Sequence, residues 1–415
     1  MFVLLLAACG TSVDSSGEPA GDSGTPSDAP VWYGDVEPIV GASCTGCHVE
    51  GGIGGFSLDS YDAAKPMAAA MASSVQAKKM PPWKADDGCR EYRDDLSLSP
   101  EALQRIVDWA AAGALEGDAA KSIHLAAPVE TLSRVDATLT LPVPYTPSTT
   151  RPDDYRCFLV DWPVDHDTYM TGYVIRPDQT SIVHHLVAYI APPEQLAEFE
   201  GLDAQDEEPG WTCFGGPGIA NQQDAEWLGA WAPGGTSGDF PDGTGIPMKT
   251  GSKVVLQMHY NTSNAAAVAD QTTMDVMYDD DVDVPATIQP WADPDWLDGT
   301  GMEIPAATNG TEHEFSFTFP RGGFQIHNAA LHMHQLGRTA RLEVDHKDGT
   351  SDCLLAISDW DFNWQRTYTF TEPYDVQGGD ALKVSCTWDN PGSEEVNWGE
   401  GTSDEMCLGT MLFSY

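Results

Sequence analysis

Hydrophobic and polar positions follow one periodicity in the first part of the chain and another in the rest. Between residues 31 and 122, apolar side chains recur at helical spacing, most clearly in the stretch that ends at Gly113. Ser99 is a typical N-cap for that last helix. A first helix before Cys44 and helical content from Pro66 to Met80 complete a pattern that predicts a small all-α domain.

Beyond residue 128 the pattern changes to strand-like runs that alternate or are rich in β-branched residues. The clearest runs span residues 181–190, 253–260 and 314–319, and clusters of Pro, Gly, Asn and Asp separate them. Only a short stretch at 194–199 has helical character. The pattern predicts one or two all-β sandwiches, and 415 residues are enough for two or three domains in all.

The first ten residues form a short apolar run that contains Leu-Ala-Ala-Cys, with the cysteine at Cys9. This string resembles the lipobox of bacterial lipoproteins, although the usual preceding basic segment is missing. Residues 10–30 have the Ser, Gly, Asp and Pro composition of a flexible linker. No later apolar run approaches the ~18 residues of a membrane span. We therefore expect a lipoprotein signal peptide at residues 1–9. The mature protein would be exported and lipid-anchored, in the periplasm or at the cell surface.

The chain is strongly acidic. It carries 20 Lys and Arg residues against 64 Asp and Glu residues, a net charge of -44. Such an excess repels phosphate backbones and excludes nucleic acid as a partner. The charge fits a solvated surface on an exported protein, and the alternative is an acidic docking face for a basic partner protein.

Residues 44–48 read Cys-Thr-Gly-Cys-His, the attachment motif of a c-type haem. In this motif the two thiols bond to the porphyrin and the histidine provides one axial ligand to iron. A zinc site or a redox dithiol is the alternative, and the histidine directly after the second cysteine argues against both. The predicted haem-binding residues are Cys44, Cys47 and His48.

Met80 is the candidate for the sixth iron ligand because Pro81 and Pro82 would stiffen the loop that holds it. A thioether ligand raises the haem potential, which suits electron transfer. Met67 and Met71 are the alternatives. The order of helix, haem motif, loop, methionine and terminal helix resembles a small monohaem cytochrome c. We therefore expect one covalently bound haem c in the first domain.

Histidines are grouped in the strand-like region. His184 and His185 are adjacent, His259 lies in a second run, and His332 and His334 are two positions apart. Residues at i and i+2 share one face of a strand. Neutral imidazoles gathered in this way bind copper, zinc or iron. A single histidine of this kind is more often structural, but five in three strings predict a metal centre.

These strings resemble those of the copper type II, ascorbate-dependent monooxygenases, the family of peptidylglycine α-hydroxylating monooxygenase and dopamine β-monooxygenase. The matching strings are His-His-Leu at 184–186, Leu-Gln-Met-His-Tyr at 256–260, His-Met-His-Gln-Leu-Gly-Arg at 332–338 and Gly-Thr-Ser-Asp-Glu-Met-Cys at 401–407. The resemblance covers roughly residues 150–415. It implies two jelly-roll-like β-sandwich domains with one copper each, here residues 128–284 and 285–415.

The resemblance also implies the copper ligands. The first site would consist of His184, His185 and His259, and the second of His332, His334 and Met406. Three imidazoles let copper cycle between Cu(I) and Cu(II), whereas two imidazoles with a thioether favour Cu(I), the state that meets dioxygen. The second site would therefore be catalytic, and the first would supply the second electron.

Six cysteines remain once Cys9 and the two haem cysteines are set aside from the nine in the chain. An even number suits disulfides in an oxidising compartment. The resemblance implies two pairs, Cys157 with Cys213 and Cys386 with Cys407. The second pair would fix the strand end beside Met406. Cys89 and Cys353 have no assignment from the resemblance.

The chain departs from the peptide-amidating members of that family. They carry an arginine two residues before His-x-His, where this chain has Ala330. They carry Asn, Tyr and Met at alternate positions after the copper methionine, where this chain has Leu408, Thr410 and Leu412. The resemblance therefore implies a more apolar substrate pocket and argues against peptides with a C-terminal glycine.

The sequence predicts a copper monooxygenase that hydroxylates a C–H bond of a small organic substrate with dioxygen. The fused haem would relay electrons from a periplasmic donor protein, in place of an external reductant such as ascorbate. One rival is a periplasmic haem and copper protein that transfers electrons or handles copper without C–H chemistry. The other is a binding module that keeps the fold and only part of the metal chemistry.

Overall fold

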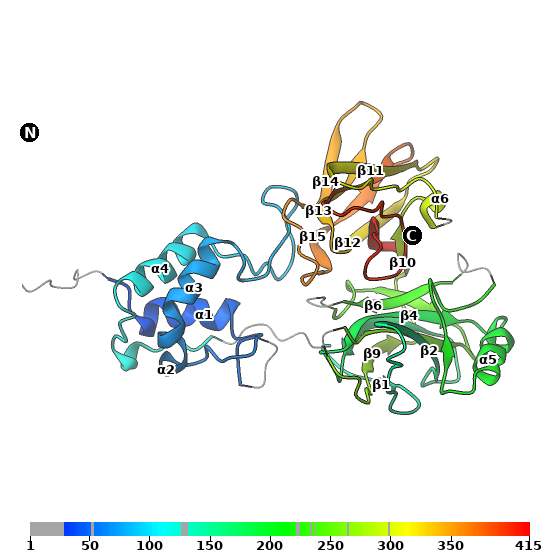
Figure 1. Ribbon diagram of the computed structural model, residues 1–415, viewed down its shortest axis with the longest axis horizontal. Helices are drawn as coiled ribbons and strands as arrows, with labels where there is room; N and C mark the ends of the chain where they lie inside the picture. Colours follow the sequence, from blue (N-terminus) through cyan, green and yellow to red (C-terminus); the bar gives the residue numbers. More distant parts are fainter. Residues whose placement is uncertain are drawn as a thin grey trace, which may run out of the picture. The chain divides into compact units, whose positions relative to one another are not determined.

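The computed structural model describes residues 29–50, 54–125, 132–220, 225–232, 235, 237–263, 265–297 and 299–415 (Figure 1). The chain divides into two compact units, one within residues 1–77 and 98–126 and the other within 78–97 and 127–415. Among the described residues, no helix has the length and apolarity to cross a membrane. Cys9 and the predicted signal peptide lie outside the described residues, so the lipid anchor stays a prediction.

The secondary structure of the first unit, within its described residues, consists of helices joined by turns and loops. Its helices are η1 (Trp32–Val36), α1 (Glu37–Ser43), α2 (Tyr61–Ala64), η2 (Lys65–Met67), α3 (Ala68–Gln76), α4 (Pro100–Ala111) and η3 (Ala119–Lys121). The predicted N-cap is confirmed, because Ser99 Oγ accepts a hydrogen bond from the Ala102 amide at 3.1 Å. Helices α3 and α4 pack around a core that includes Trp32, Ile106 and Trp109.

The part of the second unit that follows residue 126 starts with the first β-sandwich. Its strands are β1 (Ala137–Thr140), β2 (Asp153–Asp161), β3 (Thr168–Arg176), β4 (Val183–Ala191), β5 (Trp211–Thr212), β6 (Trp227–Trp231), β7 (Thr244–Met248), β8 (Lys253–Asn261) and β9 (Thr273–Asp279). The order across the sheet is β1-β9-β3-β7-β10-β6-β4-β8-β2-β5, in which β10 is the strand Val284–Trp291. The predicted runs at 181–190 and 253–260 are confirmed as β4 and β8. The short helical stretch is the start of α5 (Leu196–Gln205), which buries Phe199.

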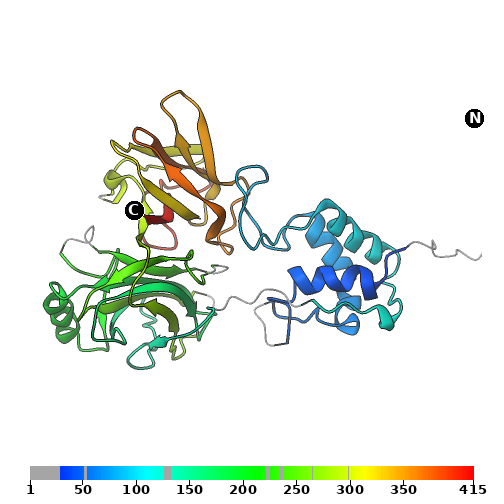
Figure 2. The same cartoon turned by 180° about the vertical axis from the view of Figure 1, so that it is seen from behind.

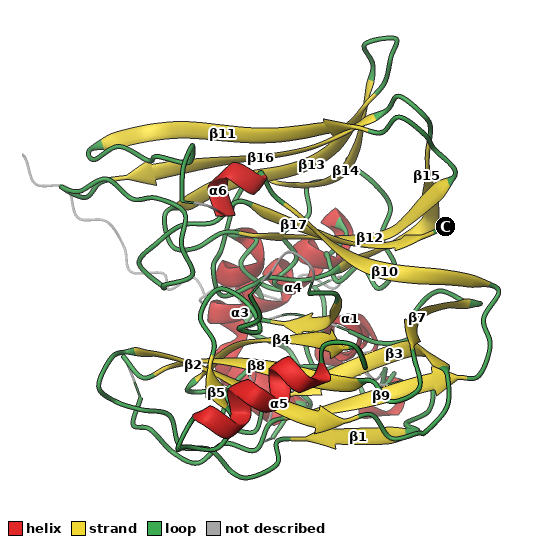
Figure 3. Cartoon of the chain, turned by 90° about the vertical axis from the view of Figure 1, so that its right-hand side faces the viewer, coloured by secondary structure: helices red, strands yellow, loops and turns green. Residues whose placement is uncertain are grey.

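The second sandwich follows. Its elements are β10 (Val284–Trp291), α6 (Pro294–Leu297), β11 (Thr308–Thr318), β12 (Phe324–His332), β13 (Gly337–Asp345), β14 (Ser351–Ile357), β15 (Tyr368–Val376), β16 (Ala381–Asn390) and β17 (Leu408–Ser414). One layer has the order β11-β16-β13-β14, and β15, β12 and β17 lie in the other layer (Figure 3). The third predicted run, 314–319, is confirmed as the end of β11.

Strand β10 joins the two sandwiches. Its first residues pair with β7, Ile288 pairs with Trp227 of β6, and the whole stretch from Ala286 to Trp291 pairs with β17. The described β-rich chain is therefore a pair of sandwiches that share a strand. The predicted division at 284 falls at the start of this shared strand.

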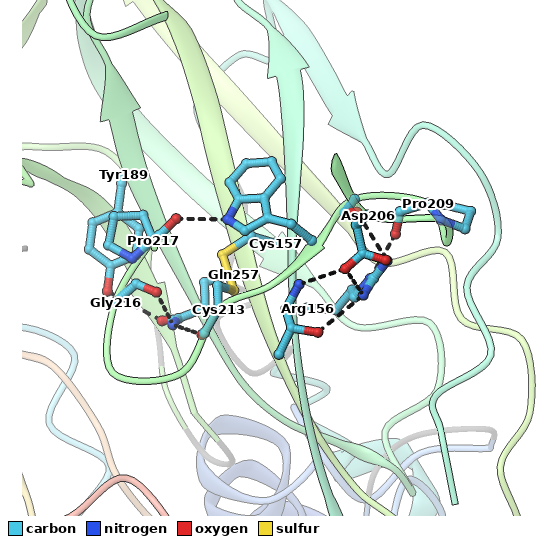
Figure 4. The surroundings of a disulfide bond; sticks show 12 residues. Arg156, Cys157, Tyr189, Asp206, Pro209, Cys213, Gly216, Pro217 and Gln257 are labelled. Carbon is cyan, nitrogen blue, oxygen red and sulfur yellow. Dashed lines mark hydrogen bonds and ion pairs between the residues drawn. A yellow bond between two sulfur atoms is a disulfide. The ribbon is translucent and has the colours of Figure 1, made fainter. Parts of the chain in front are cut away.

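Three disulfides stabilise the second unit: Cys157–Cys213, Cys386–Cys407 and Cys89–Cys353. The first two are the pairs that the resemblance implied. Figure 4 shows the first of these. Beside it, Arg156 donates to a carboxylate oxygen of Asp206 at 2.9 Å. Gln257 donates to the carbonyls of Cys213 and Gly216 at 2.9 and 2.8 Å. The two bonds from Gln257 attach the loop after β5 to β8, at a position two residues before His259.

Candidate metal centres

The first histidine set lies on two paired strands. His184 and His185 are on β4, His259 is on β8, and His185 is the cross-strand partner of His259. Adjacent strand residues normally point to opposite faces. Here the register shifts between Val183 and His185, a β-bulge or irregularity that turns the extra residue out of strict alternation. This irregularity explains how two neighbouring histidines serve one site.

The three rings meet through the same type of nitrogen. His185 Nδ1 lies 3.3 Å from His184 Nδ1 and 3.3 Å from His259 Nδ1. The ligand atoms of the three histidines all lie within 4.8 Å of one another. Two nitrogens bound at ~2.0 Å with a tetrahedral angle between them would be ~3.3 Å apart. The spacing therefore fits three imidazoles on one metal ion.

Asp153 on β2 fixes which nitrogen of His259 carries the proton. Its Oδ1 accepts from His259 Nε2 at 2.9 Å, which leaves the Nδ1 lone pair directed at His185. It also accepts from Asn261 at 2.7 Å and Thr402 at 2.8 Å. Burial alone would raise the pKa of Asp153, but these hydrogen bonds outweigh it and lower the pKa. Because Asp153 holds the proton on Nε2, the Nδ1 lone pair of His259 is available to a metal ion.

The surroundings keep these rings uncharged. Burial, followed by the charges of neighbouring histidines, lowers the pKa of His184 to about 3 and places the pKa of His185 well below its ordinary value. The buried Nε2 of His184 has no hydrogen-bond partner. Tyr155 stacks on His259 with ring centroids 4.0 Å apart. Neutral imidazoles in an apolar setting are the form that binds a transition metal.

The second set lies at the end of β12. His332 is the last residue of the strand and His334 lies just beyond it, with their imidazole centroids 5.1 Å apart. Met333, between them, is buried in the sandwich core. His332 Nδ1 donates to Gln365 Oε1 at 2.5 Å, and His334 Nδ1 donates to the carbonyl of Asp404 at 2.9 Å. Both rings therefore offer Nε2 to a metal, the opposite choice from the first site.

Glu405 connects the loop of Met406 to this turn. Its two carboxylate oxygens accept from the amides of His334 at 2.9 Å and Leu336 at 2.5 Å, and from the Trp388 indole at 2.9 Å. Burial raises the pKa of Glu405 to about 7. Met406 follows it directly and is buried. The sequence contained this glutamate only as the acid in a matching string, and its role as a clamp comes from the structure.

The two sets face each other across Phe362. Its ring centroid lies 5.2 Å from that of His184 and 6.2 Å from that of His334, and the rings of His185 and His332 are 6.4 Å apart. The structure thus gathers all five predicted histidines in one region of the second unit.

Comparison with known proteins agrees with this geometry. Residues 139–267 match the N-terminal domain, and residues 300–414 the C-terminal domain, of the copper type II ascorbate-dependent monooxygenases. Together the matches cover more than half of the chain. The chain belongs to this family.

Among curated relatives of this family member, the human "Putative DBH-like monooxygenase protein 2" is 24% identical over 286 residues, which is 63% of this chain and 53% of the relative. The mouse "DBH-like monooxygenase protein 2" is 22% identical over 278 residues, 61% of this chain and 42% of the relative. The chain thus spans about half the length of these relatives. A solved peptide:N-glycanase F has 8% identity and a TM-score of 0.33, covering 67% of this chain and 95% of its own, too distant to carry an argument.

Three of the four positions at which this member departs from the peptide-amidating enzymes lie on β12 and β17 at or near His332. Ala330 of β12 pairs with Thr410 of β17, and His332 pairs with Leu408. Leu412 is buried in the core of the first sandwich. The positions beside His332 are therefore occupied by small or apolar side chains.

The predicted haem residues lie at the end of α1 in the helical unit. The amide of His48 donates to the Cys44 carbonyl at 2.9 Å, so residues 44–48 form a tight turn. His48 Nδ1 donates to the Phe56 carbonyl at 3.3 Å, which leaves Nε2 for a metal. A Cβ on Gly54 would stand 2.4 Å from His48 Nδ1, so only glycine permits this approach. Burial, then the neighbouring Cys47, raises the pKa of Cys44 to about 12. The residues present fit a haem attachment site.

The structure separates the three candidate methionine ligands. Met71 is buried in the helical core and Met67 packs at its edge. Met80 falls in the segment Lys78–Ser97, which belongs to the β-rich unit. The assignment of Met80 as the sixth ligand therefore stays a prediction.

Replacing Asp153 with alanine should weaken copper binding at the first site about 10–100-fold, the usual effect of losing a partner of a ligating histidine. Without the carboxylate, His259 is free to carry its proton on Nδ1. Copper titration of the metal-free protein measures the change. Asp161→Ala, an exposed acid on the same strand, is the matched control, and equal affinities in both variants would remove Asp153 from this role.

Acid should destabilise the copper-free protein. Burial first, then the neighbouring His334, lowers the pKa of His332 to about 3, and burial lowers that of His334 to about 4, whereas an unfolded histidine titrates at about 6.5. Below about pH 6.5 the unfolded chain therefore binds more protons than the folded chain. The free energy of unfolding then decreases as the pH is lowered. Urea unfolding at about pH 7.5 and pH 5 measures this loss of stability. The difference between the two pH values should be smaller in the double variant His332→Ala/His334→Ala.

Proposed function

We propose that this chain is a monooxygenase that uses two copper ions to insert one atom of dioxygen into a C–H bond of a small organic substrate. The other oxygen atom leaves as water, and each turnover takes up two electrons and two protons. The observation that carries the proposal is the pair of ligand sets in one unit. Three Nδ1 atoms are spaced for one ion, and opposite them lie two histidines that offer Nε2, beside the clamped loop of Met406.

The bound copper would supply the one-electron chemistry and the dioxygen site. The chain's own residues would hold each proton on the nitrogen that is not a ligand. Asp153 does so for His259, Gln365 for His332, and the Asp404 carbonyl for His334. The amide of Gln365 also donates to the Phe362 carbonyl at 2.8 Å, so its oxygen must face His332. Such partners fix the ring orientation of metal-binding histidines.

The substrate that fits best is small and uncharged. The strand pairs Ala330–Thr410 and His332–Leu408 support this, because the residues at and near the predicted copper ligand His332 in the sheet are short or apolar. A peptide carboxylate would need a cationic partner there, and Ala330 stands at the position of the arginine in peptide-amidating relatives. Peptides with a C-terminal glycine are therefore poor candidates.

The electrons would enter through a c-type haem on Cys44, Cys47 and His48. The tight turn and the Nδ1 anchor of His48 support this assignment. An exported electron carrier would reduce the haem, and an external reductant such as ascorbate is the alternative source. Three disulfides fit an oxidising compartment, in line with export and a lipid anchor at Cys9.

The deciding experiment is metal analysis of protein matured with haem, followed by oxygen uptake against a panel of small C–H substrates. The proposal predicts two coppers and one haem per chain, and one hydroxylated product per dioxygen consumed. Full metal loading with electron transfer but no substrate-dependent oxygen uptake would favour the alternative, an electron-transfer or copper-handling protein. A protein that binds fewer than two coppers would contradict the proposal.

A further inference from the structure

The segment Lys78–Ser97, called the strap below, lies between α3 and α4 along the chain and yet belongs to the second unit. Figures 1 and 2 both show it in light blue beside the orange β14 and β15. The disulfide from Cys89 to Cys353 links it to β14, and Tyr92 is buried in the core of the second sandwich. The strap lies outside both stretches that match the copper monooxygenase family. A segment from outside the family domains therefore packs on the second copper domain.

The strap holds both ends of the loop between β14 and β15, residues 358–367. At the start of the loop, the Asp86 carboxylate accepts from the Ser358 amide at 3.2 Å and from its hydroxyl at 2.5 Å. Just after the end of the loop, the Tyr368 hydroxyl accepts from the Lys84 amide at 3.2 Å. The strap is therefore in a position to restrict the conformation of the whole loop.

The side chain of Lys84 contacts two acids of the same loop. Its Nζ donates to the Asp359 carboxylate at 2.9 Å and lies 3.9 Å from a carboxylate oxygen of Asp361. The lysine side chain is only 7% exposed, whereas that of Asp359 is 88% exposed. A buried ammonium group is stable only when acceptors replace the water that it has lost. The lysine therefore draws both carboxylates to the strap.

The other side of the loop faces the predicted copper ligands. Gln365 Oε1 accepts the Nδ1 proton of His332 at 2.5 Å, and the Trp360 indole donates to the His334 carbonyl at 3.1 Å. The ring of Phe362 lies 6.2 Å from that of His334, centroid to centroid. Three residues of one loop thus contact the two histidines of the second site.

Asp361 connects the lysine to this side of the loop. One of its carboxylate oxygens accepts from the amide and from the side chain of Asn363, both at 3.1 Å. Its carbonyl accepts from the Trp364 amide at 2.9 Å. These bonds form a turn that ends directly before Gln365, and the other carboxylate oxygen of Asp361 faces Lys84.

We infer that Lys84 is a positioning residue for the second copper site. It acts through the 358–367 loop, which holds the Gln365 amide oxygen against His332 Nδ1 and so directs Nε2 of that ring to the metal. Second partners of this kind fix the orientation of ligating histidines. The inference rests on the proposed function, because it concerns the orientation of a predicted copper ligand.

The test is the copper affinity of the second site, titrated in metal-free, full-length protein that also carries His259→Ala to remove the first site. Lys84→Met keeps most of the buried volume and removes the charge. It should weaken copper binding about tenfold, the lower end of the effect of losing a partner of a ligating histidine. Electron paramagnetic resonance of the bound Cu(II) should change as well, because the His332 ring loses its single orientation.

Two further lysine variants complete this test. Lys84→Arg keeps the cation and should recover most of the affinity and the original Cu(II) spectrum. Lys347→Met, at an exposed lysine in the turn between β13 and β14, is the matched control and should leave both unchanged.

A double-mutant cycle separates positioning from a general loss of stability. Gln365→Leu removes the acceptor of the His332 proton, so Lys84→Met should weaken copper binding much less in that background than on its own. Asp359→Ala covers the case in which Lys84→Met does not fold, because the aspartate side chain is largely exposed. It should give a smaller loss of affinity in the same direction, since Asp361 remains near the lysine.

Unchanged second-site affinity and spectra in Lys84→Met and Asp359→Ala would overturn the positioning role and leave the proposed monooxygenase intact. Fully additive effects of Lys84→Met and Gln365→Leu would do the same. Wild-type protein that binds no copper at His332 and His334 would overturn the inference together with the proposed function.

Discussion

Replacing His259 with alanine is expected to leave one copper per chain instead of two and to abolish substrate-dependent oxygen uptake. His259 is fully buried on β8, and its Nδ1 is one of the three that converge at the first site. Loss of a partner of a ligating histidine costs 10–100-fold in affinity or activity, so loss of the ligand itself should cost more than about 100-fold. Metal analysis and an oxygen electrode measure the two effects.

The matched control is His166→Ala, which removes an exposed histidine of the same sandwich. His259→Gln keeps a side chain in the cavity and separates loss of the ligand from loss of packing. Both His259 variants should keep the second copper, because its predicted ligands lie at the end of β12, just beyond it, and in the loop before β17. If His259→Ala bound two coppers as tightly as the unaltered protein, the first site would be misassigned.

Replacing Glu405 with alanine should unfold the second copper site. The change leaves two backbone amides and the Trp388 indole without their acceptor. Each buried unsatisfied donor costs about 1–3 kcal/mol, so the free energy of unfolding should fall by about 3–5 kcal/mol after partial relaxation. The loop of Met406 would also lose its attachment to the His334 turn, so the second copper should be lost.

Glu405→Gln is the informative companion because its amide oxygen still accepts hydrogen bonds. It should recover part of the stability and of the second copper. Glu314→Ala, an exposed acid on β11 of the same sandwich, is the control. Urea unfolding and copper titration are the measurements, and a Glu405→Ala protein with normal stability and two coppers would show that the clamp does not position Met406.

The sequence alone was sufficient for the local and compositional features. The Ser99 cap, the helix before Cys44 and the strands at β4 and β8 follow from short-range patterns, and all are present. The candidate copper ligands were named from four strings, and the structure gathers their five histidines in one region. The expected position of His334 on a strand face was wrong in detail, because β12 ends at His332.

The sequence by itself determined which side chains are available as ligands, because imidazole, thioether and thiolate chemistry belongs to the residue. Only the tertiary structure decided which nitrogen each histidine presents. Asp153 and His259, or Glu405 and His334, are far apart in the chain and meet through strand pairing and loop packing. The tertiary structure also decided the Cys89–Cys353 pair and the inclusion of residues 78–97 in the second unit. Such contacts depend on long-range register, which no local pattern encodes.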